Sequence, residues 1–130
     1  MTEKYIEEAR KILSKFKKID YAFMFGSALK TPLRESDVDI LIGGNLDAPE
    51  KNDLTAELAL VLKRKIDIVM ANESPPELVL KAFSHGQPLL VNKQENLKRD
   101  YFRNYYSYDD ARTLRELKIS RVKRRYSYGG

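Results

Sequence analysis

The chain has 130 residues, the size of a single domain, which excludes a multidomain architecture. It contains no cysteine, so disulfide frameworks, zinc–thiolate sites and cysteine nucleophiles are excluded. Its 24 basic and 19 acidic residues give a net charge of +5, and 42% hydrophobic residues suffice for a compact core. No apolar run approaches the roughly 20 residues that span a bilayer, and the N-terminus does not resemble a secretion signal. We therefore expect a cytoplasmic protein without a membrane segment.

The first part of the chain shows one helix pattern and two strand patterns. Apolar residues at helical spacing predict a helix over 2–18. An apolar run rich in Tyr, Phe and Ile over 19–25, ended by Gly26, predicts a buried strand. Residues 37–42 alternate acidic with aliphatic side chains before they become fully apolar, which predicts a second strand ended by a Gly-Gly pair.

Two further helix and strand patterns follow. Leucines and a valine on one helical face predict a helix over 48–63, and the mainly aliphatic residues 65–70 predict a strand. Ser74, with a proline next to it and a glutamate three residues on, predicts the start of another helix. His85 stands at its expected end, where a cation favours the helix terminus, and we assign it no catalytic role. Residues 88–91 predict one more strand.

The end of the chain differs in composition from the rest. From Lys98 onward it carries ten basic and four acidic residues, a charge of +6, and six of the eight tyrosines. We predict a helix over 94–106 and a second capping box at Ser107 that restarts a helix to about Lys118. This tail has three interpretations: a helix that packs on the body, a surface that docks a partner protein, or a stripe that binds nucleic acid. We therefore divide the chain into a core over 1–92 and a basic, Tyr-rich helical extension over 93–130 of the same domain.

Three acidic residues stand within predicted strands, where aliphatic residues are usual. Asp37 and Asp39 are two residues apart, so their side chains point to the same face, about 6.6 Å from each other. If the strand of Asp67 lies beside theirs, a third carboxylate joins them. Like charges about 4 Å apart repel by about 4 kcal/mol at an effective dielectric constant of 20, so a cation is expected there. Mg²⁺ binds a few carboxylates together with nucleotide phosphates, and a pair of such ions suits nucleotidyl transfer.

The turn after the first predicted strand suits a phosphate group. Gly26 and Ser27 present a backbone without Cβ, amide groups and a hydroxyl directly after that strand. Lys30 and Arg34 are close enough in sequence to neutralise phosphate oxygens. The informative pattern is the complete order: strand, Gly-Ser, a short spacer, Asp-x-Asp on a strand, and one Asp on a later strand.

This order resembles the DNA polymerase beta superfamily of nucleotidyltransferases, and more narrowly the minimal nucleotidyltransferases, over about residues 1–92. The segments that carry the resemblance are Phe25-Gly26-Ser27 and Ser36-Asp37-Val38-Asp39-Ile40-Leu41. The resemblance implies an α/β (α+β) fold, a small mixed β-sheet flanked by helices. The spacer between Ser27 and Asp37 is one residue shorter than is common in the family, and Lys30 stands where many relatives have Arg.

The same resemblance assigns roles to the residues of the pattern. Asp37, Asp39 and Asp67 would be metal ligands and catalytic residues, with two Mg²⁺ ions, and Asp67 would assist deprotonation of the attacking hydroxyl. Gly26, Ser27 and Lys30 would contact the triphosphate of ATP, with Lys30 the least specific of these assignments.

Many minimal nucleotidyltransferases act as the antitoxin of a HEPN-domain ribonuclease, to which they attach AMP on a tyrosine. The resemblance therefore implies an AMP-transferring antitoxin, with the toxin on a separate chain. From the composition we expect no membrane partner, and nucleic acid is the least favoured of the three interpretations of the tail. Two alternatives stay open: AMP transfer to a small hydroxylated molecule, and a non-catalytic antitoxin that acts by contact alone. A small acceptor would need a second domain to build its pocket, and this chain offers none.

Overall fold

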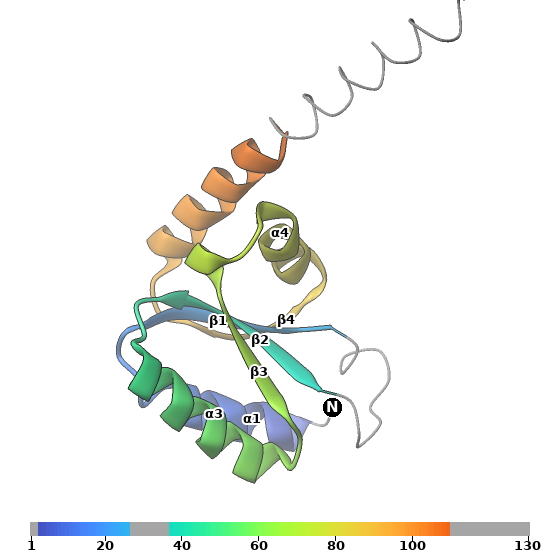
Figure 1. Ribbon diagram of the computed structural model, residues 1–130. Coiled ribbons are helices and arrows are strands. Elements are labelled where there is room, and N and C mark those ends of the chain that lie inside the picture. Colours follow the sequence, from blue (N-terminus) through green and yellow to red (C-terminus); the bar gives the residue numbers. More distant parts are fainter. Residues whose placement is uncertain (1–2, 27–36, 110–130) are drawn as a thin grey trace, which may run out of the picture.

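The computed structural model of the chain describes residues 3–26 and 37–109. The strands form one four-stranded sheet in the order β3-β2-β1-β4 (Figure 1). In it β1 pairs antiparallel with β2 and β4, whereas β2 pairs parallel with β3, so the sheet is mixed. The elements in chain order are α1 (Glu3–Leu13), β1 (Ile19–Phe25), β2 (Val38–Gly44), α3 (Ala48–Leu62), β3 (Ile66–Met70), the 3₁₀ turn η1 (Ala71–Glu73), α4 (Pro76–His85) and β4 (Gln87–Val91). A further helix covers residues 94–109 and is called the 94–109 helix below.

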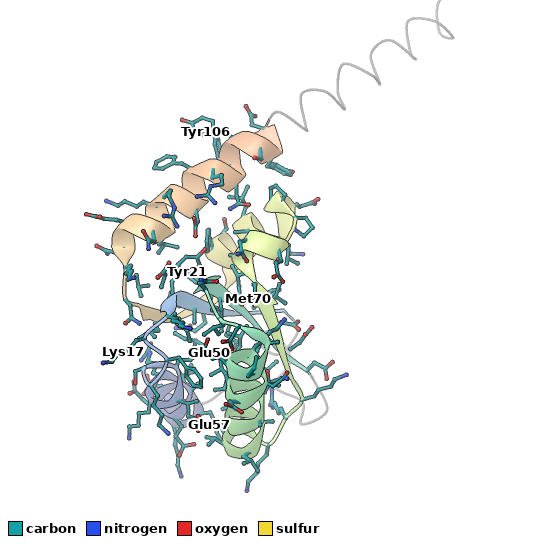
Figure 2. The ribbon with its side chains drawn as sticks, turned by 60° about the vertical axis from the view of Figure 1, so that its left-hand side comes forward. Lys17, Tyr21, Glu50, Glu57, Met70 and Tyr106 are labelled. Carbon is teal, nitrogen blue, oxygen red and sulfur yellow. The ribbon has the colours of Figure 1, made fainter. Side chains whose placement is uncertain are left out.

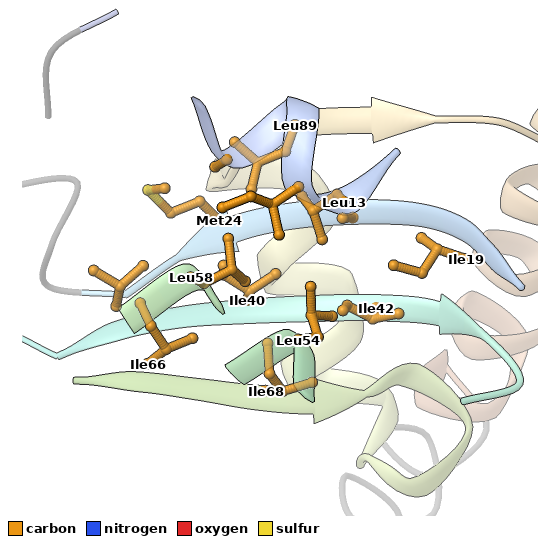
Figure 3. Close-up of a cluster of buried hydrophobic side chains, with 14 of the residues drawn as sticks. Leu13, Ile19, Met24, Ile40, Ile42, Leu54, Leu58, Ile66, Ile68 and Leu89 are labelled. Atoms are coloured by element: carbon orange, nitrogen blue, oxygen red, sulfur yellow. The ribbon is translucent and has the colours of Figure 1, made fainter. Parts of the chain in front are cut away.

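Helices cover both faces of this sheet (Figure 1). The larger core lies between one face and helices α1 and α3, where Ile40 and Ile42 of β2 meet Leu54 and Leu58 of α3 (Figure 3). The smaller core lies on the opposite face, between the sheet and α4. Because both faces are covered, β1 is buried along almost its whole length, as its mainly apolar sequence predicts. The expected fold, a small mixed sheet flanked by helices, is confirmed.

Helix α3 matches its predicted boundaries most closely, and the local sequence at its two ends explains why. Helix α3 begins with a capping box, in which the Asp47 side chain accepts from the Glu50 amide and the Glu50 side chain accepts from the Asp47 amide. It ends at Lys63, whose backbone adopts a left-handed conformation with φ of 54°. These caps satisfy backbone groups at both ends of the helix, so its boundaries agree with the predicted 48–63 to within one residue.

Helix α1 is shorter than predicted. The expected helix reached residue 18, but α1 ends at Leu13. After it, Lys15 and Phe16 donate to carbonyls three residues earlier, which tightens the chain into a turn. That turn places Phe16 against the larger core, so tertiary packing ended the helix before the polar lysines.

Two other predicted boundaries are wrong. Helix α4 begins after Pro75, which offers no side-chain cap, and the Ser74 hydroxyl instead donates to the Met70 carbonyl at 2.7 Å, which closes the preceding turn. The 94–109 helix also runs through Ser107 to Asp109 without the predicted interruption, and the remainder of the predicted second helix, to about Lys118, lies outside the described residues. His85 is the last residue of α4, as predicted.

The 94–109 helix packs on the same face of the sheet as α4. Its Tyr101 ring lies 6.2 Å from the Phe83 ring of α4.

Strand β4 ends at Val91, next to the predicted boundary between core and extension, and that division stays a prediction. Among the helices described in 3–26 and 37–109, none has the length and apolar character needed to cross a bilayer.

Candidate active site

Two of the predicted acidic residues lie directly side by side in the sheet. In the parallel pairing of β2 with β3, Asp39 is the register partner of Asp67. Their neighbours Ile40 and Ile68 are buried in the larger core, so both carboxylates point to the opposite face, the face of α4. The adjacency of the two strands, on which the role of Asp67 depended, is therefore confirmed.

The end of β1 completes this edge of the sheet. In the antiparallel pairing of β1 with β2, Phe25 lies opposite Asp39, so the next residue, Gly26, lies beside the Asp39 end of β2. Gly26 has a φ of 92°, a conformation that favours glycine, and a Cβ built there would lie 2.5 Å from Oδ2 of Asp39. Only a residue without a side chain leaves the Asp39 carboxylate in its position, which is a physical reason for glycine in this motif.

The surroundings of Asp39 disfavour the ionised form of its carboxyl group. Its partial burial, followed by the charges of Asp67 and then Asp37, raises the pKa of Asp39 above the usual range of an aspartate. Asp37 lies one residue before β2 and is exposed, as is Asp67. Asp37 and Asp67 are thus near enough to raise the pKa of Asp39 and exposed enough to contact a ligand from solvent.

These residues suit Mg²⁺ in chemistry and in charge. All the donors are carboxylate oxygens, and the raised pKa of Asp39 shows a negative charge that an added cation would relieve. Within 3–26 and 37–109, no three acidic or histidine side chains are gathered closely enough to bind an ion by themselves. Mg²⁺ needs only one or two carboxylates when waters and substrate phosphates complete its shell, so the Asp39–Asp67 pair fits such an ion.

The remaining predicted residues belong to the segment between β1 and β2. Ser27, Lys30 and Arg34 lie outside the described residues, so their predicted phosphate contacts stay predictions. Helix α4 packs on β1 and β4, toward the side of the sheet away from β3. The acidic residues on β2 and β3 are consequently reachable beside α4, with Asp39 half-buried and Asp67 exposed.

A second polar region, which the sequence analysis missed, lies at the other end of the same strands. A cavity of about 490 Å³ is lined there by Gly43 and Gly44 of β2 and by side chains that include Asp20, Arg99 and Arg103. The local sequence shows only isolated charges at these positions, since they meet only after the 94–109 helix has packed. This cavity is separated from Asp39 by the length of β2, so it is distinct from the acidic site.

Comparison with protein families matches residues 7–95 of this chain to the family described as "Polymerase beta, Nucleotidyltransferase". The matched segment contains Gly26, Asp37, Asp39 and Asp67. Among proteins with curated functions, no sequence is similar enough to count as a match.

Solved structures share the fold over nearly the whole chain. A toxin–antitoxin complex with AMP-PNP contains a chain 23% identical, with a TM-score of 0.72, and the alignment covers 90% of this chain and 97% of that one. A chain of the toxin–antitoxin complex MntA–HepT is 20% identical, with a TM-score of 0.70 and coverage of 93% and 98%. A chain of the complex of tri-AMPylated Shewanella oneidensis HEPN toxin with MNT antitoxin is 20% identical, with a TM-score of 0.69 and coverage of 94% of this chain and 98% of that one. At these identities the likeness shows a common fold.

Proposed function

Because this chain belongs to the polymerase beta nucleotidyltransferase family, we propose that it transfers AMP from ATP to a tyrosine hydroxyl of a HEPN-type toxin and so acts as its antitoxin. The observation that carries this proposal is the Asp39–Asp67 pair, held in register across β2 and β3 beside Gly26. The reaction takes place in the cytoplasm, where ATP is supplied.

Each residue of the site has a role in this proposal. Asp37, Asp39 and Asp67 would hold Mg²⁺, in one or two ions, and Gly26, Ser27 and Lys30 would contact the triphosphate. When bound, the metal would neutralise phosphate charge and favour ionisation of the attacking hydroxyl. The half-burial of Asp39 keeps its charge poorly screened by water, which strengthens its attraction for a cation.

The proposed reaction is a single displacement at the α-phosphorus of ATP. The tyrosine oxygen forms a bond to that phosphorus, and the bond from the α-phosphorus to the bridging oxygen breaks, so pyrophosphate leaves. The proton of the hydroxyl passes to Asp67, whose exposed carboxylate is free to release it to water. Most of the acceleration would come from positioning and charge neutralisation, since the chemistry needs no covalent enzyme intermediate.

The structural neighbours support the choice of nucleotide and partner. One of them is a toxin–antitoxin complex with AMP-PNP, and another contains a tri-AMPylated HEPN toxin with its MNT antitoxin. Both align over at least 90% of this chain, so they share its fold almost throughout.

Mass spectrometry of an acceptor protein tests the proposal. A HEPN-domain protein from the same genome, incubated with this chain, ATP and Mg²⁺, should gain the mass of one or more AMP groups on tyrosine. Omitting Mg²⁺ or using Asp39→Asn should prevent the gain. An unmodified acceptor that still loses its toxicity on contact with the Asp39→Asn variant would contradict AMP transfer as the mode of action.

A further inference from the structure

An exposed aromatic surface covers the outer side of the 94–109 helix. It consists of Tyr101, Phe102, Tyr105 and Tyr106, with Phe83 of α4 at its edge. Phe102 is 52% exposed and Tyr106 is 62% exposed, although the body of the protein has buried most of its large apolar side chains. In Figure 2, Tyr106 lies on the part of this helix that is remote from the sheet. A contiguous patch of this kind is typical of a protein interaction site.

The aromatic side chains are held in place by one another. The rings of Tyr101 and Tyr105 stack with centroids 6.3 Å apart, and those of Phe102 and Tyr106 stack at 6.4 Å. Beside them, Phe23, Phe83, Leu97 and Lys98 contribute to a groove of about 460 Å³. Rigid aromatic residues lose little conformational entropy on binding, so they favour tight association with a partner.

Basic residues flank the aromatic surface. Lys98 lines the groove, and Arg99 and Arg103 follow on the same helix. The two arginines contact Asp100 through single nitrogen atoms, at 3.2 and 3.5 Å, while their side chains stay 56% and 59% exposed. Each guanidinium has five N–H donors, so each retains donors for a further carboxylate.

We propose that this aromatic surface is the docking site for the acceptor protein, a separate chain that presents apolar side chains bordered by acidic residues. A second copy of this chain fits less well, since symmetric pairing would bring the same basic residues of two copies together. The proposal rests on the proposed function for the identity of the partner. The aromatic surface and the acidic site lie on the same face of the sheet, with α4 between them, so a partner bound to the surface must extend past α4 to bring its tyrosine to Asp39 and Asp67.

A double variant tests this docking site. Phe102→Ala combined with Tyr106→Ala removes two mostly exposed rings, so the fold should be retained. We expect the Kd for a HEPN-domain protein from the same genome to rise at least about 30-fold, and the KM for that acceptor to rise in parallel. The KM for ATP and the stabilisation by Mg²⁺ with ATP should stay unchanged. Leu60→Ala is the matched control, because Leu60 is 78% exposed on α3, on the opposite face of the sheet.

The charge of the partner is tested separately. Association of the wild-type chain with the acceptor should slow as salt is added, and Lys98→Glu should slow it about 10-fold at low salt. A rate that is independent of both salt and Lys98 would overturn the acidic border of the partner.

The outcomes separate docking from catalysis. If the double variant binds and modifies the acceptor as the wild type does, the docking site is wrong while AMP transfer stands. If binding is lost in the double variant but the wild type transfers no AMP, docking stands and the proposed function fails. Absence of wild-type binding to the HEPN-domain protein overturns the docking site. Self-association of the wild type that the double variant loses, measured by sedimentation, assigns the surface to a second copy and also overturns it.

Discussion

The Tyr21 hydroxyl of β1 donates a hydrogen bond of 2.8 Å to Oδ2 of Asp100 on the 94–109 helix. Both residues are buried, and 79 positions separate them in the sequence. Burial, and then the bond to Asp100, raise the pKa of Tyr21 above that of an ordinary tyrosine. Asp100 in turn accepts from Arg99 at 3.2 Å, so one carboxylate ties the sheet to the helix that carries the aromatic surface. In Figure 2, Tyr21 lies between the sheet and this helix.

Removing that hydroxyl should loosen the helix from the sheet. We expect Tyr21→Phe to lower the free energy of unfolding by about 1 to 2 kcal/mol, because the buried Asp100 carboxylate loses a donor. Urea denaturation followed by circular dichroism measures this change. Tyr5→Phe, at an exposed tyrosine of α1, is the control and should change the free energy by less than about 0.5 kcal/mol. Equal effects of the two substitutions would contradict a structural role for the Tyr21–Asp100 bond.

Neutralising Asp39 should stabilise the protein in the absence of metal. The raised pKa means that the folded state binds a proton at Asp39 more tightly than the unfolded state does, so stability is lost as pH rises through that pKa. Asp39→Asn should therefore raise the free energy of unfolding at pH 7 by about 0.5 to 1 kcal/mol, after allowance for solvent screening. The advantage of the variant should shrink as pH falls through the raised pKa of Asp39 and should disappear below the ordinary aspartate pKa of 3.8. A difference between variant and wild type that does not vary with pH would contradict this account.

With Mg²⁺ and a nucleotide bound, the wild type should become more stable than the Asp39→Asn variant. At about 100 times its Kd, a ligand that binds only the folded state adds about 2.7 kcal/mol. Thermal denaturation with Mg²⁺ and AMP-PNP should accordingly raise the Tm of the wild type, and Asp39→Asn should lose most of this gain. Addition of EDTA should return the wild type to its Tm without ligand. An equal gain in the variant would argue against metal binding at Asp39.

A methyl group at Gly26 should displace the Asp39 carboxylate. Gly26→Ala adds a Cβ 2.5 Å from Oδ2 of Asp39 at a φ of 92°, so we expect a loss of about 1 kcal/mol in stability and a larger loss of AMP transfer. Gly44→Ala is the matched control, because Gly44 also has a positive φ, 130°, at the other end of β2. The control should lose stability and keep nucleotide affinity. Assays at a temperature where both variants are folded separate the two effects.

Asp67 should matter more for the reaction than for binding of ATP. If it accepts the proton of the attacking hydroxyl, Asp67→Asn should lower kcat by about 10² to 10⁴-fold and change the KM for ATP much less. Steady-state kinetics of pyrophosphate release give both values. A KM for ATP that rises as much as kcat falls would instead make Asp67 mainly a metal ligand.

Local sequence patterns predicted much of the fold and the site, within limits that particular elements illustrate. The strand over 19–25 and the helix over 48–63 agree with their predictions to within one residue, because an apolar run and the helical spacing of leucines are local signals. The α1 boundary was misplaced, since the packing of Phe16 is a contact with distant residues. The aromatic side chains of the tail were noticed, but their common outward face became visible only in the folded helix.

By itself the sequence determined the chemistry of the acidic site: carboxylates two residues apart on one strand, a third on a later strand, and a glycine after the first strand. Only the tertiary structure decided that β2 and β3 are parallel neighbours with Asp39 opposite Asp67, and that Tyr21 meets Asp100. Side-chain alternation along a strand depends on the backbone of that strand alone, whereas register and helix docking depend on residues far away in the chain. A shift of one residue in register would move Asp67 out of line with Asp39, and no local pattern encodes that choice.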